Sequence, residues 1–198
     1  MFVTFEGLDG SGKTTQADLL HRRLEADGRE VVATREPGGT ELGEQIRNLV
    51  LHGGDVTPWA EALLYAASRA QHVDEVIRPA LERGAAVVCD RYVDSSVAYQ
   101  GAGRGLGFDR VLELNLAAVG GLMPERTFLL LLDPGDVAGR LSRDHDRLER
   151  EGDDFRKRVD ACYRELAARF PERIVVLDAT RPAEELAEEV HGALRIRT

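Results

Sequence analysis

Lysine is nearly absent from this chain of 198 residues. Lys13 and Lys157 are the two lysines among 26 basic residues, so arginine carries almost all of the positive charge. Acidic residues still outnumber basic ones, and the formal net charge is −9. Binding to a nucleic-acid backbone requires a basic surface, so this balance argues against nucleic acid as the main partner.

Cysteine and long apolar runs are also scarce. The two cysteines, Cys89 and Cys162, have neither the spacing of a zinc site nor that of a disulfide framework, and we expect both to be core thiols. No apolar run approaches the roughly 18 residues that span a bilayer. The first residues lack the pattern of a signal peptide. We therefore expect a cytoplasmic protein without a membrane segment.

The length favours a single α/β domain over residues 1–198. Short apolar runs predict buried strands of a parallel sheet. The five runs are Phe2–Phe5, Val31–Ala33, Ala85–Cys89, Thr127–Leu132 and Ile174–Leu177. Helical patterns fill the gaps, so the fold class is a five-stranded parallel sheet with helices on both faces.

Three helical patterns carry specific expectations. The first helix is predicted to follow the glycine-rich loop and to stop at Gly28. In a later helix, Leu63, Ala67, Ala70 and Ile77 are expected to lie on the buried face. The segment 109–119 is apolar on more than one side, which fits either a fully buried helix or an oligomer contact.

The stretch FEGLDGSGKTTQ contains the spacing G-x-x-x-x-G-K-[ST], formed by Gly7, Gly12, Lys13 and Thr14. A strand before it and a helix after it are the context that a P-loop requires. Its backbone N–H groups would converge on phosphate oxygens, Lys13 would add a positive charge, and Thr14 would bind Mg²⁺. This pattern predicts an ATP-type nucleotide as ligand.

Two further segments follow predicted strands. VVCDRY places Asp90 and Arg91 at a carboxyl strand end, where sheets of this class bind ligands. Asp90 would hold Mg²⁺ through water and Arg91 would clamp a phosphate, although a salt-bridged strand end is the simpler reading. TREPGGT carries Glu36 before a Pro-Gly-Gly turn, and it fits a plain turn or a substrate loop equally well.

Arginine recurs in two helical segments. Tyr65 and Arg69 in YAASR share a helix face, which suits a base and its phosphate or ordinary packing. Arg140, Arg143 and Arg147 recur in a segment mixed with acidic residues. The P-loop has no arginine of its own, so we favour a lid at about 139–153 that delivers cations over a solvated surface helix.

Together these segments resemble the thymidylate kinases, a family of nucleoside monophosphate kinases. The resemblance covers nearly the whole chain: KTTQ, TREPGGT, YAASRAQH, DRYVDSSVAYQGAGRG, the basic lid and DATRP. TREPGG with the DRY and YQG segments is much more specific than the P-loop. The basic lid resembles the bacterial subtype, in which the lid supplies charge to the transition state.

The resemblance implies roles for named residues. The implied ATP-binding residues are Gly7, Leu8, Asp9, Gly10, Ser11, Gly12, Lys13, Thr14, Thr15, Arg140, Ala179 and Arg181. The implied dTMP-binding residues are Asp9, Glu36, Tyr65, Arg69, Arg91, Ser96, Tyr99 and Gln100, with Tyr65 stacking on thymine and Tyr99 crowding a 2′-hydroxyl. Lys13, Asp9, Arg91, Arg143 and Arg147 are the implied catalytic residues. Thr14 and Asp90 are the expected Mg²⁺ ligands, and the family implies a homodimer.

The expected reaction is the transfer of a phosphoryl group from ATP to dTMP. A kinase for a nucleoside or another acceptor is the main alternative, in which Asp9 or Glu36 would act as the base. A GTP-dependent switch is a second alternative, but the chain contains no N-K-x-D tetrapeptide for reading guanine.

Overall fold

A computed structural model describes residues 1–133, 147–148 and 151–195 of the chain. Its sheet has five parallel strands in the order β2-β3-β1-β4-β5. The strands are β1 (Phe2–Gly7), β2 (Val31–Arg35), β3 (Ala86–Asp90), β4 (Arg126–Leu131) and β5 (Ile174–Asp178). All five predicted strands are confirmed, with boundaries that differ by one or two residues.

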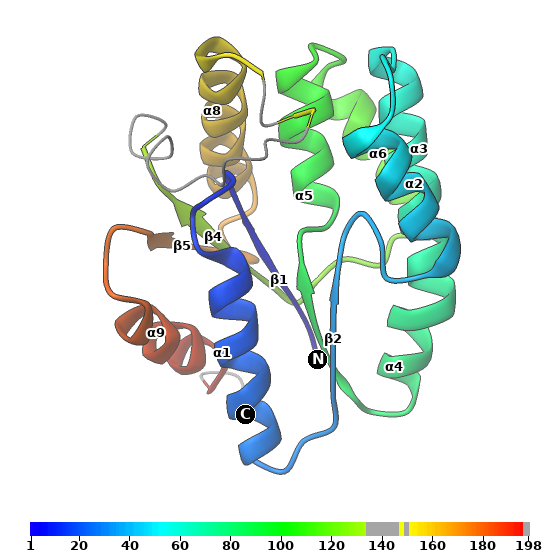
Figure 1. The fold of residues 1–198 in the computed structure, drawn as a ribbon. Helices are drawn as coiled ribbons and strands as arrows, with labels where there is room; N and C mark the ends of the chain where they lie inside the picture. Colours follow the sequence, from blue (N-terminus) through cyan, green and yellow to red (C-terminus); the bar gives the residue numbers. More distant parts are fainter. Residues whose placement is uncertain (134–146, 149–150, 196–198) are drawn as a thin grey trace.

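Helices cover both faces of this sheet (Figure 1). α1 packs against β1, β2 and β3 and also against α9, whereas α8 packs against β4 and β5 and α5 against β1. The helices are α1 (Lys13–Ala26), α2 (Glu41–His52), α3 (Pro58–His72), α4 (Arg78–Glu82), α5 (Val93–Ser96), α6 (Phe108–Ala118), α8 (Asp153–Arg169) and α9 (Ala183–Arg195), with π-helical segments η1 (Val73–Ile77) and η2 (Val97–Gly103). The predicted fold class is therefore confirmed.

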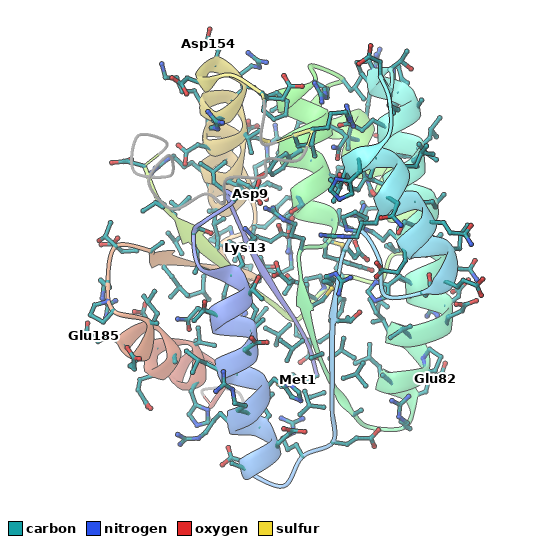
Figure 2. All side chains as sticks on the ribbon, in the orientation of Figure 1. Met1, Asp9, Lys13, Glu82, Asp154 and Glu185 are labelled. Atoms are coloured by element: carbon teal, nitrogen blue, oxygen red, sulfur yellow. The ribbon has the colours of Figure 1, made fainter. Side chains whose placement is uncertain are left out.

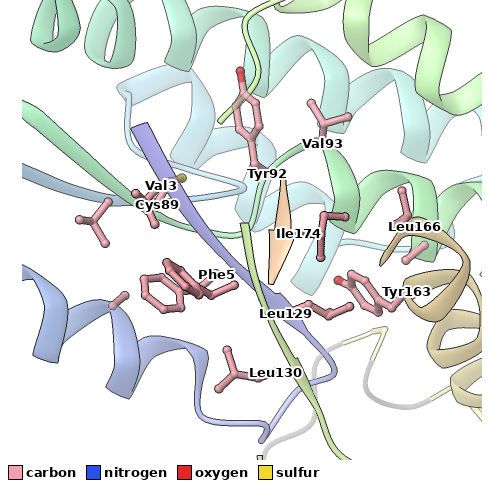
Figure 3. Close-up of a cluster of buried hydrophobic side chains, with 14 of the residues drawn as sticks. Val3, Phe5, Cys89, Tyr92, Val93, Leu129, Leu130, Tyr163, Leu166 and Ile174 are labelled. Carbon is pink, nitrogen blue, oxygen red and sulfur yellow. The ribbon is translucent and has the colours of Figure 1, made fainter. Parts of the chain in front are cut away.

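The core lies between the central strands and the helices on either side. Figure 3 shows Phe5 of β1 and Leu129 of β4 on the sheet, with Tyr163 and Leu166 of α8 packed nearby. The rings of Phe5 and Phe128 stack with their centroids 5.4 Å apart. Full burial of each such side chain contributes roughly 1.5–3 kcal/mol to folding. This packing makes the carboxyl ends of the strands a rigid platform.

The first helix follows the prediction closely. α1 ends at Ala26, and Gly28 has a φ of +77°, with its backbone N–H bonded to the Glu25 carbonyl at 2.9 Å. Glycine reaches this left-handed conformation without a steric cost, so Gly28 stops the helix as expected.

The predicted buried face is wrong for α3, although Ile77 in the following segment η1 is buried as expected. Leu63 is 53% exposed and Ala67 is exposed, while the buried face carries Tyr65 and Arg69 together with Glu61. Apolar periodicity gave the wrong face because the buried face of α3 is largely polar. Tyr65 and Arg69 on this face line a cavity.

The remaining structural expectations concern α6 and the cysteines. On α6, Val111 and Asn115 are buried, whereas Leu112 and Leu116 are only partly buried, so the helix is not fully enclosed in a single chain. Cys89 and Cys162 are both buried thiols, as predicted. Among the residues that the structure describes, no helix is long and apolar enough to cross a membrane.

Candidate active site

The loop between β1 and α1 is shaped to receive an anion. α1 begins at Lys13 directly after Gly12, whose φ is +96°, and its first turn carries no acidic residue. Free backbone N–H groups and the helix dipole therefore favour an anion at this point. Gly7, with a φ of +137°, has to be glycine, because a Cβ atom would lie 2.3 Å from the Leu130 carbonyl oxygen.

Lys13 and Asp9 form the charged part of this loop, at the upper ends of α1 and β1 in Figure 2. The Lys13 Nζ atom donates to the Leu8 carbonyl at 2.8 Å and lies 3.9 Å from the Asp9 carboxylate. Burial lowers the pKa of Lys13 to about 8, and Arg91 acts in the same direction. Burial raises the pKa of Asp9, but Arg91 and Lys13 outweigh it and lower that pKa to about 2. Asp9 is therefore ionised at neutral pH.

Thr14 and Asp90, the predicted Mg²⁺ ligands, come together beside the P-loop. The Thr14 hydroxyl donates to the Asp90 carboxylate at 2.6 Å, and both residues line the same cavity. Hard oxygen donors of this type suit Mg²⁺ when water and phosphate oxygens complete its coordination. Within the described parts of the chain, no group of three or more His, Cys, Asp or Glu side chains could hold a metal alone. The site fits an ion that is shared with a nucleotide.

A large open cavity, here called the donor cavity, extends from the P-loop across the ends of β2 and β3. It is lined by Asp9, Gly10, Gly12, Lys13, Thr14, Thr15, Ala17, Asp18, Ala33, Thr34, Arg35, Glu36, Gly39, Arg47, Val76, Val88, Asp90 and Arg91. Gly7, Leu8 and Ser11 are buried behind this lining. Most of the predicted P-loop contacts therefore face one open space.

A second, smaller cavity, here called the acceptor cavity, opens next to the first. It is lined by Asp9, Glu36, Pro37, Arg47, Leu51, Tyr65, Arg69, Arg91, Ser95, Ser96, Tyr99, Gln100 and Leu148. All eight residues that the sequence pointed to as acceptor contacts are among them. They come from five separate parts of the chain, so only the fold brings them together.

A buried network fixes one wall of the acceptor cavity. Glu36 accepts a hydrogen bond from Arg69 Nε at 2.6 Å and lies 2.9 Å from His72 Nδ1. Arg69 also donates to the Ser96 hydroxyl at 3.0 Å and to the Tyr92 carbonyl at 3.1 Å. Most N–H groups of Arg69 are engaged by the protein. Arg69 therefore offers a ligand a fixed positive charge but few free hydrogen-bond donors.

Asp9, Glu36, Arg47 and Arg91 line both cavities and mark the junction between them. Arg91 has a φ of 72°, which is unusual for a residue other than glycine. Its guanidinium binds the Asp9 carboxylate, donates to the Gly7 carbonyl at 3.0 Å and lies over the Tyr99 ring. The Tyr99 hydroxyl donates to Asp9 at 3.1 Å. These contacts with Asp9 and Gly7 hold the Arg91 guanidinium at the junction.

Comparison with known proteins agrees with this geometry. The family model described as thymidylate kinase matches residues 5–190. The chain belongs to the thymidylate kinase family. It is 57% identical over 198 residues to a thymidylate kinase of Leifsonia xyli subsp. xyli, with 98% of this chain and 94% of the relative covered. It is 53% identical over 200 residues to that of Bifidobacterium longum, with 98% and 97% covered.

A solved structure shows the same fold. The crystal structure of thymidylate kinase from Ehrlichia chaffeensis superposes with a TM-score of 0.82 at 34% identity, covering 98% of each chain. As a member of the thymidylate kinase family, the protein is a phosphotransferase of the nucleoside monophosphate kinase type.

The three lid arginines expected from the thymidylate kinase resemblance are not among the described residues that line the two cavities. Arg140 and Arg143 fall outside the described residues. Arg147 is described, but its guanidinium binds Glu61 and its Nε donates to the Val50 carbonyl at 2.9 Å. Arg147 lines neither cavity in this arrangement. Its expected role in the transition state therefore stays a prediction.

The two residues expected beside adenine lie near the start of α9 and line neither of the two cavities. Ala179 is buried and its N–H donates to the Leu131 carbonyl at 2.9 Å. Arg181 is half exposed and pairs with Glu185 and Glu189. Gln16, in the first turn of α1, donates to the Ala183 carbonyl at 2.8 Å. This contact ties the start of α9 to the P-loop helix.

Two residues at or next to the thymidylate kinase site, Arg47 and Glu6, are not among those expected from the sequence. Arg47 lines both cavities, and its guanidinium donates to the Pro37 carbonyl at 2.9 Å. Glu6 is fully buried and accepts hydrogen bonds from the hydroxyl of Ser95, which lines the acceptor cavity, and, at 3.1 Å, from the Tyr163 hydroxyl. Arg47 lies mid-helix in an ordinary amphipathic pattern, so its spacing gave no signal. Glu6 interrupts an apolar strand, and that interruption was the available signal.

Proposed function

We propose that this thymidylate kinase family member transfers the terminal phosphoryl group of ATP to dTMP, giving ADP and dTDP. The observation that carries the proposal is the pair of adjoining cavities that share Asp9, Glu36, Arg47 and Arg91. One cavity contains the P-loop and the other contains all the expected acceptor contacts. A donor and an acceptor bound in these two spaces would bring their phosphates together at the shared residues.

The donor triphosphate lies along the P-loop in this proposal. Backbone N–H groups from Gly7 to Thr15 and the Lys13 ammonium group bind its phosphate oxygens. The adenine extends toward Ala179 and Arg181, and Arg140, outside the described residues, is a further proposed ATP contact. The contact of Gln16 with Ala183 supports this direction, since it holds the 178–183 segment against α1.

The acceptor dTMP occupies the smaller cavity with its phosphate at the junction. Tyr65, buried on α3, stacks on thymine, and Ser96 and Gln100 line the base and the sugar. Tyr99 closes the space beside the sugar, which disfavours a 2′-hydroxyl. Glu36 and Arg69 hold the sugar side, and Arg91 binds the acceptor phosphate.

The electrostatics favour a phosphorylated acceptor over a nucleoside. A nucleoside hydroxyl would need a general base, but Asp9 has a pKa of about 2 and is bound to Arg91. Both carboxylate oxygens of Glu36 are already engaged by Arg69 and His72. A phosphate monoester is mostly a dianion at neutral pH and needs no base. Catalysis then rests on positioning the two phosphates and on stabilising the charge of the group in transfer.

Lys13 and Arg91 provide positive charge that stabilises the phosphoryl group in transfer. We propose that Arg143 and Arg147 of the lid contribute as well. Arg147 would do so only after its ion pair with Glu61 opens, because that contact occupies its guanidinium. Asp9 orients Arg91 and keeps its guanidinium at the junction.

We further propose that Thr14 and Asp90 hold Mg²⁺ together with the donor phosphates. The bound ion would neutralise phosphate charge and help to orient the donor. The hydroxyl and carboxylate beside Lys13 suit this ion by chemistry and by position.

A coupled assay for ADP release tests the proposed reaction. The purified protein is supplied with Mg-ATP and either thymidine or dTMP at equal concentration. We expect ADP release with dTMP and none above background with thymidine. Turnover of thymidine alone would show that the acceptor is a hydroxyl and would overturn the proposal.

We also propose a cytoplasmic homodimer. Among the described residues, five large hydrophobic side chains are exposed, and four of them, Leu42, Leu49, Trp59 and Leu63, lie on α2 and α3. Leu42 and Leu49 are seven residues apart and Trp59 and Leu63 four apart, so each pair shares a helix face. Two buried thiols without a disulfide are typical of a reducing compartment. Light scattering after gel filtration should give twice the monomer mass, and Leu63→Arg should give the monomer.

A further inference from the structure

Glu61 is a buried carboxylate to which neither the sequence reasoning nor the proposed reaction gives a role. It lies in the first turn of α3 and has a relative exposure of 0%. Gln100, Arg104 and Arg147 all turn their side chains toward it. These three residues come from two distant parts of the chain, and Gln100 lines the acceptor cavity. Burying a carboxylate costs free energy, so the burial of Glu61 among three polar partners points to a specific role for it.

The two arginines hold the Glu61 carboxylate in one position. Arg104 Nη2 lies 3.2 Å from Glu61 Oε2, and its other guanidinium branch binds Glu151. Arg147 binds the same carboxylate, and its backbone N–H donates to the Leu51 carbonyl at 3.1 Å. Both oxygens of the Glu61 carboxylate accept hydrogen bonds from these neighbours, so the carboxylate acts as an acceptor in this network.

This arrangement fixes the side-chain amide of Gln100. Gln100 Nε2 donates to Glu61 Oε1 at 2.9 Å. A carboxylate cannot donate a proton to the amide oxygen, so the opposite orientation would place two acceptors together. The amide nitrogen therefore stays on Glu61, and the amide oxygen is the part of Gln100 that remains for a ligand in the cavity.

We propose that Glu61 is a positioning residue that selects the acceptor base by holding the carbonyl oxygen of Gln100 toward it. Thymine and uracil carry an N–H at ring position 3, and this N–H can donate a hydrogen bond to a carbonyl oxygen. Cytosine carries a lone pair on its ring nitrogen at position 3. This nitrogen would face the amide oxygen of Gln100 without forming a hydrogen bond. The inference rests on the proposed binding of dTMP in this cavity.

The test compares Glu61→Gln with the wild type for dTMP and dCMP as acceptors. An amide at position 61 both donates and accepts, so it would let the Gln100 amide turn over. We expect the ratio of kcat/KM for dTMP to that for dCMP to fall by about tenfold or more, mainly through a higher KM for dTMP. The KM for ATP should stay within about twofold, because a general loss of structure would raise it too.

Glu151→Gln is the matched control. It removes the other carboxylate partner of Arg104 and leaves the contact between Glu61 and Gln100 in place. This variant should keep the wild-type ratio between dTMP and dCMP. A fall as large as that in Glu61→Gln would mean that the network acts through Arg104, and it would overturn the proposal.

A second variant guards against misfolding. If thermal unfolding of Glu61→Gln shows no native protein, Glu61→Asp takes its place. The shorter side chain keeps the charge for both arginines but withdraws the carboxylate from Gln100. The same fall in the ratio of kcat/KM for dTMP to that for dCMP is expected. An unchanged ratio in a folded Glu61 variant overturns the inference alone. A wild type without activity on dTMP would instead overturn the proposed function.

Discussion

The carboxylate of Asp9 is bound to the guanidinium of Arg91 at the junction of the donor and acceptor cavities. The Asp9 carboxylate lies where two phosphates are expected, yet it does not make the site unfavourable for phosphate. Arg91 and Lys13 both lie close to Asp9, so the local charge stays positive. The Asp9 carboxylate also fixes Arg91 in a direction that its backbone alone would leave open.

Replacing Lys13 tests the charge that the P-loop supplies. Lys13→Ala should lower kcat by about 10² to 10³, since the loss of one preorganised donor typically costs this much. Lys157, exposed on α8, is the other lysine in the chain and provides the control. Lys157→Ala should leave kcat within about twofold of the wild type. Steady-state kinetics with saturating dTMP measure both, and near-normal turnover in Lys13→Ala would remove Lys13 from the mechanism.

Arg47 is predicted to bind the acceptor phosphate. Its guanidinium lines both cavities and, within the described residues, has no carboxylate within ion-pair distance. Arg47→Ala should raise the KM for dTMP by about tenfold, the loss of a charged hydrogen bond. Arg22→Ala on the exposed surface of α1 removes the same charge away from the site. Equal effects of the two variants would show that only net charge matters.

The two lid arginines are expected to differ. Arg143→Ala should lower kcat by about 10² with little change in the KM for dTMP, since its predicted contact forms only during transfer. Arg147→Ala should also raise the KM for dTMP, because the Arg147 side chain binds Glu61 and the Val50 carbonyl. Initial rates over a grid of ATP and dTMP concentrations separate the two patterns. A pure kcat effect in Arg147→Ala would mean that its contact with Glu61 plays no part in acceptor binding.

Glu6 should make stability depend on pH. Burial, and then the charge of Asp94, raises the pKa of Glu6 to about 7. The folded state then binds a proton more tightly than the unfolded chain does, so this stabilisation is full below the ordinary carboxyl pKa. It is lost as the pH rises through about 7, by roughly 3 kcal/mol in total.

Urea unfolding at about pH 5 and pH 8 measures this loss. The wild type should lose more free energy of unfolding between the two values than Glu6→Gln, because the amide does not titrate. Glu6→Gln keeps a hydrogen-bond acceptor for Tyr92 N–H, which now binds Glu6 at 2.7 Å. Identical losses in the two proteins would show that Glu6 titrates normally.

The sheet could be predicted from local patterns, whereas the acceptor residues were expected from the resemblance to the thymidylate kinases. Each buried strand reads as a short apolar run, and Glu36, Arg69 and Tyr99 lie in segments with specific spacing. Arg69 and Tyr99 lie on α3 and η2 rather than at strand ends, so their meeting with Glu36 around one cavity depends on contacts between distant segments.

Other parts of the site left no local signal. Glu61 reads as an ordinary acidic residue in the first turn of a helix, and its partners Gln100 and Arg147 are far away in the sequence. Leu63 was placed on the buried face of α3 because periodicity counts apolar residues, whereas that face carries Arg69 and Tyr65. Contacts between distant segments decide such positions, and a single sequence does not contain them.

The central claim is that the acceptor cavity binds dTMP for phosphorylation. Its most direct test is kcat/KM for dTMP, dUMP, UMP and CMP, measured with Mg-ATP and with the nucleoside diphosphate product identified by chromatography. The structure predicts the highest value for dTMP, with dTDP as product, and low values for UMP and CMP. A preference for UMP or CMP would contradict the account while leaving the fold intact.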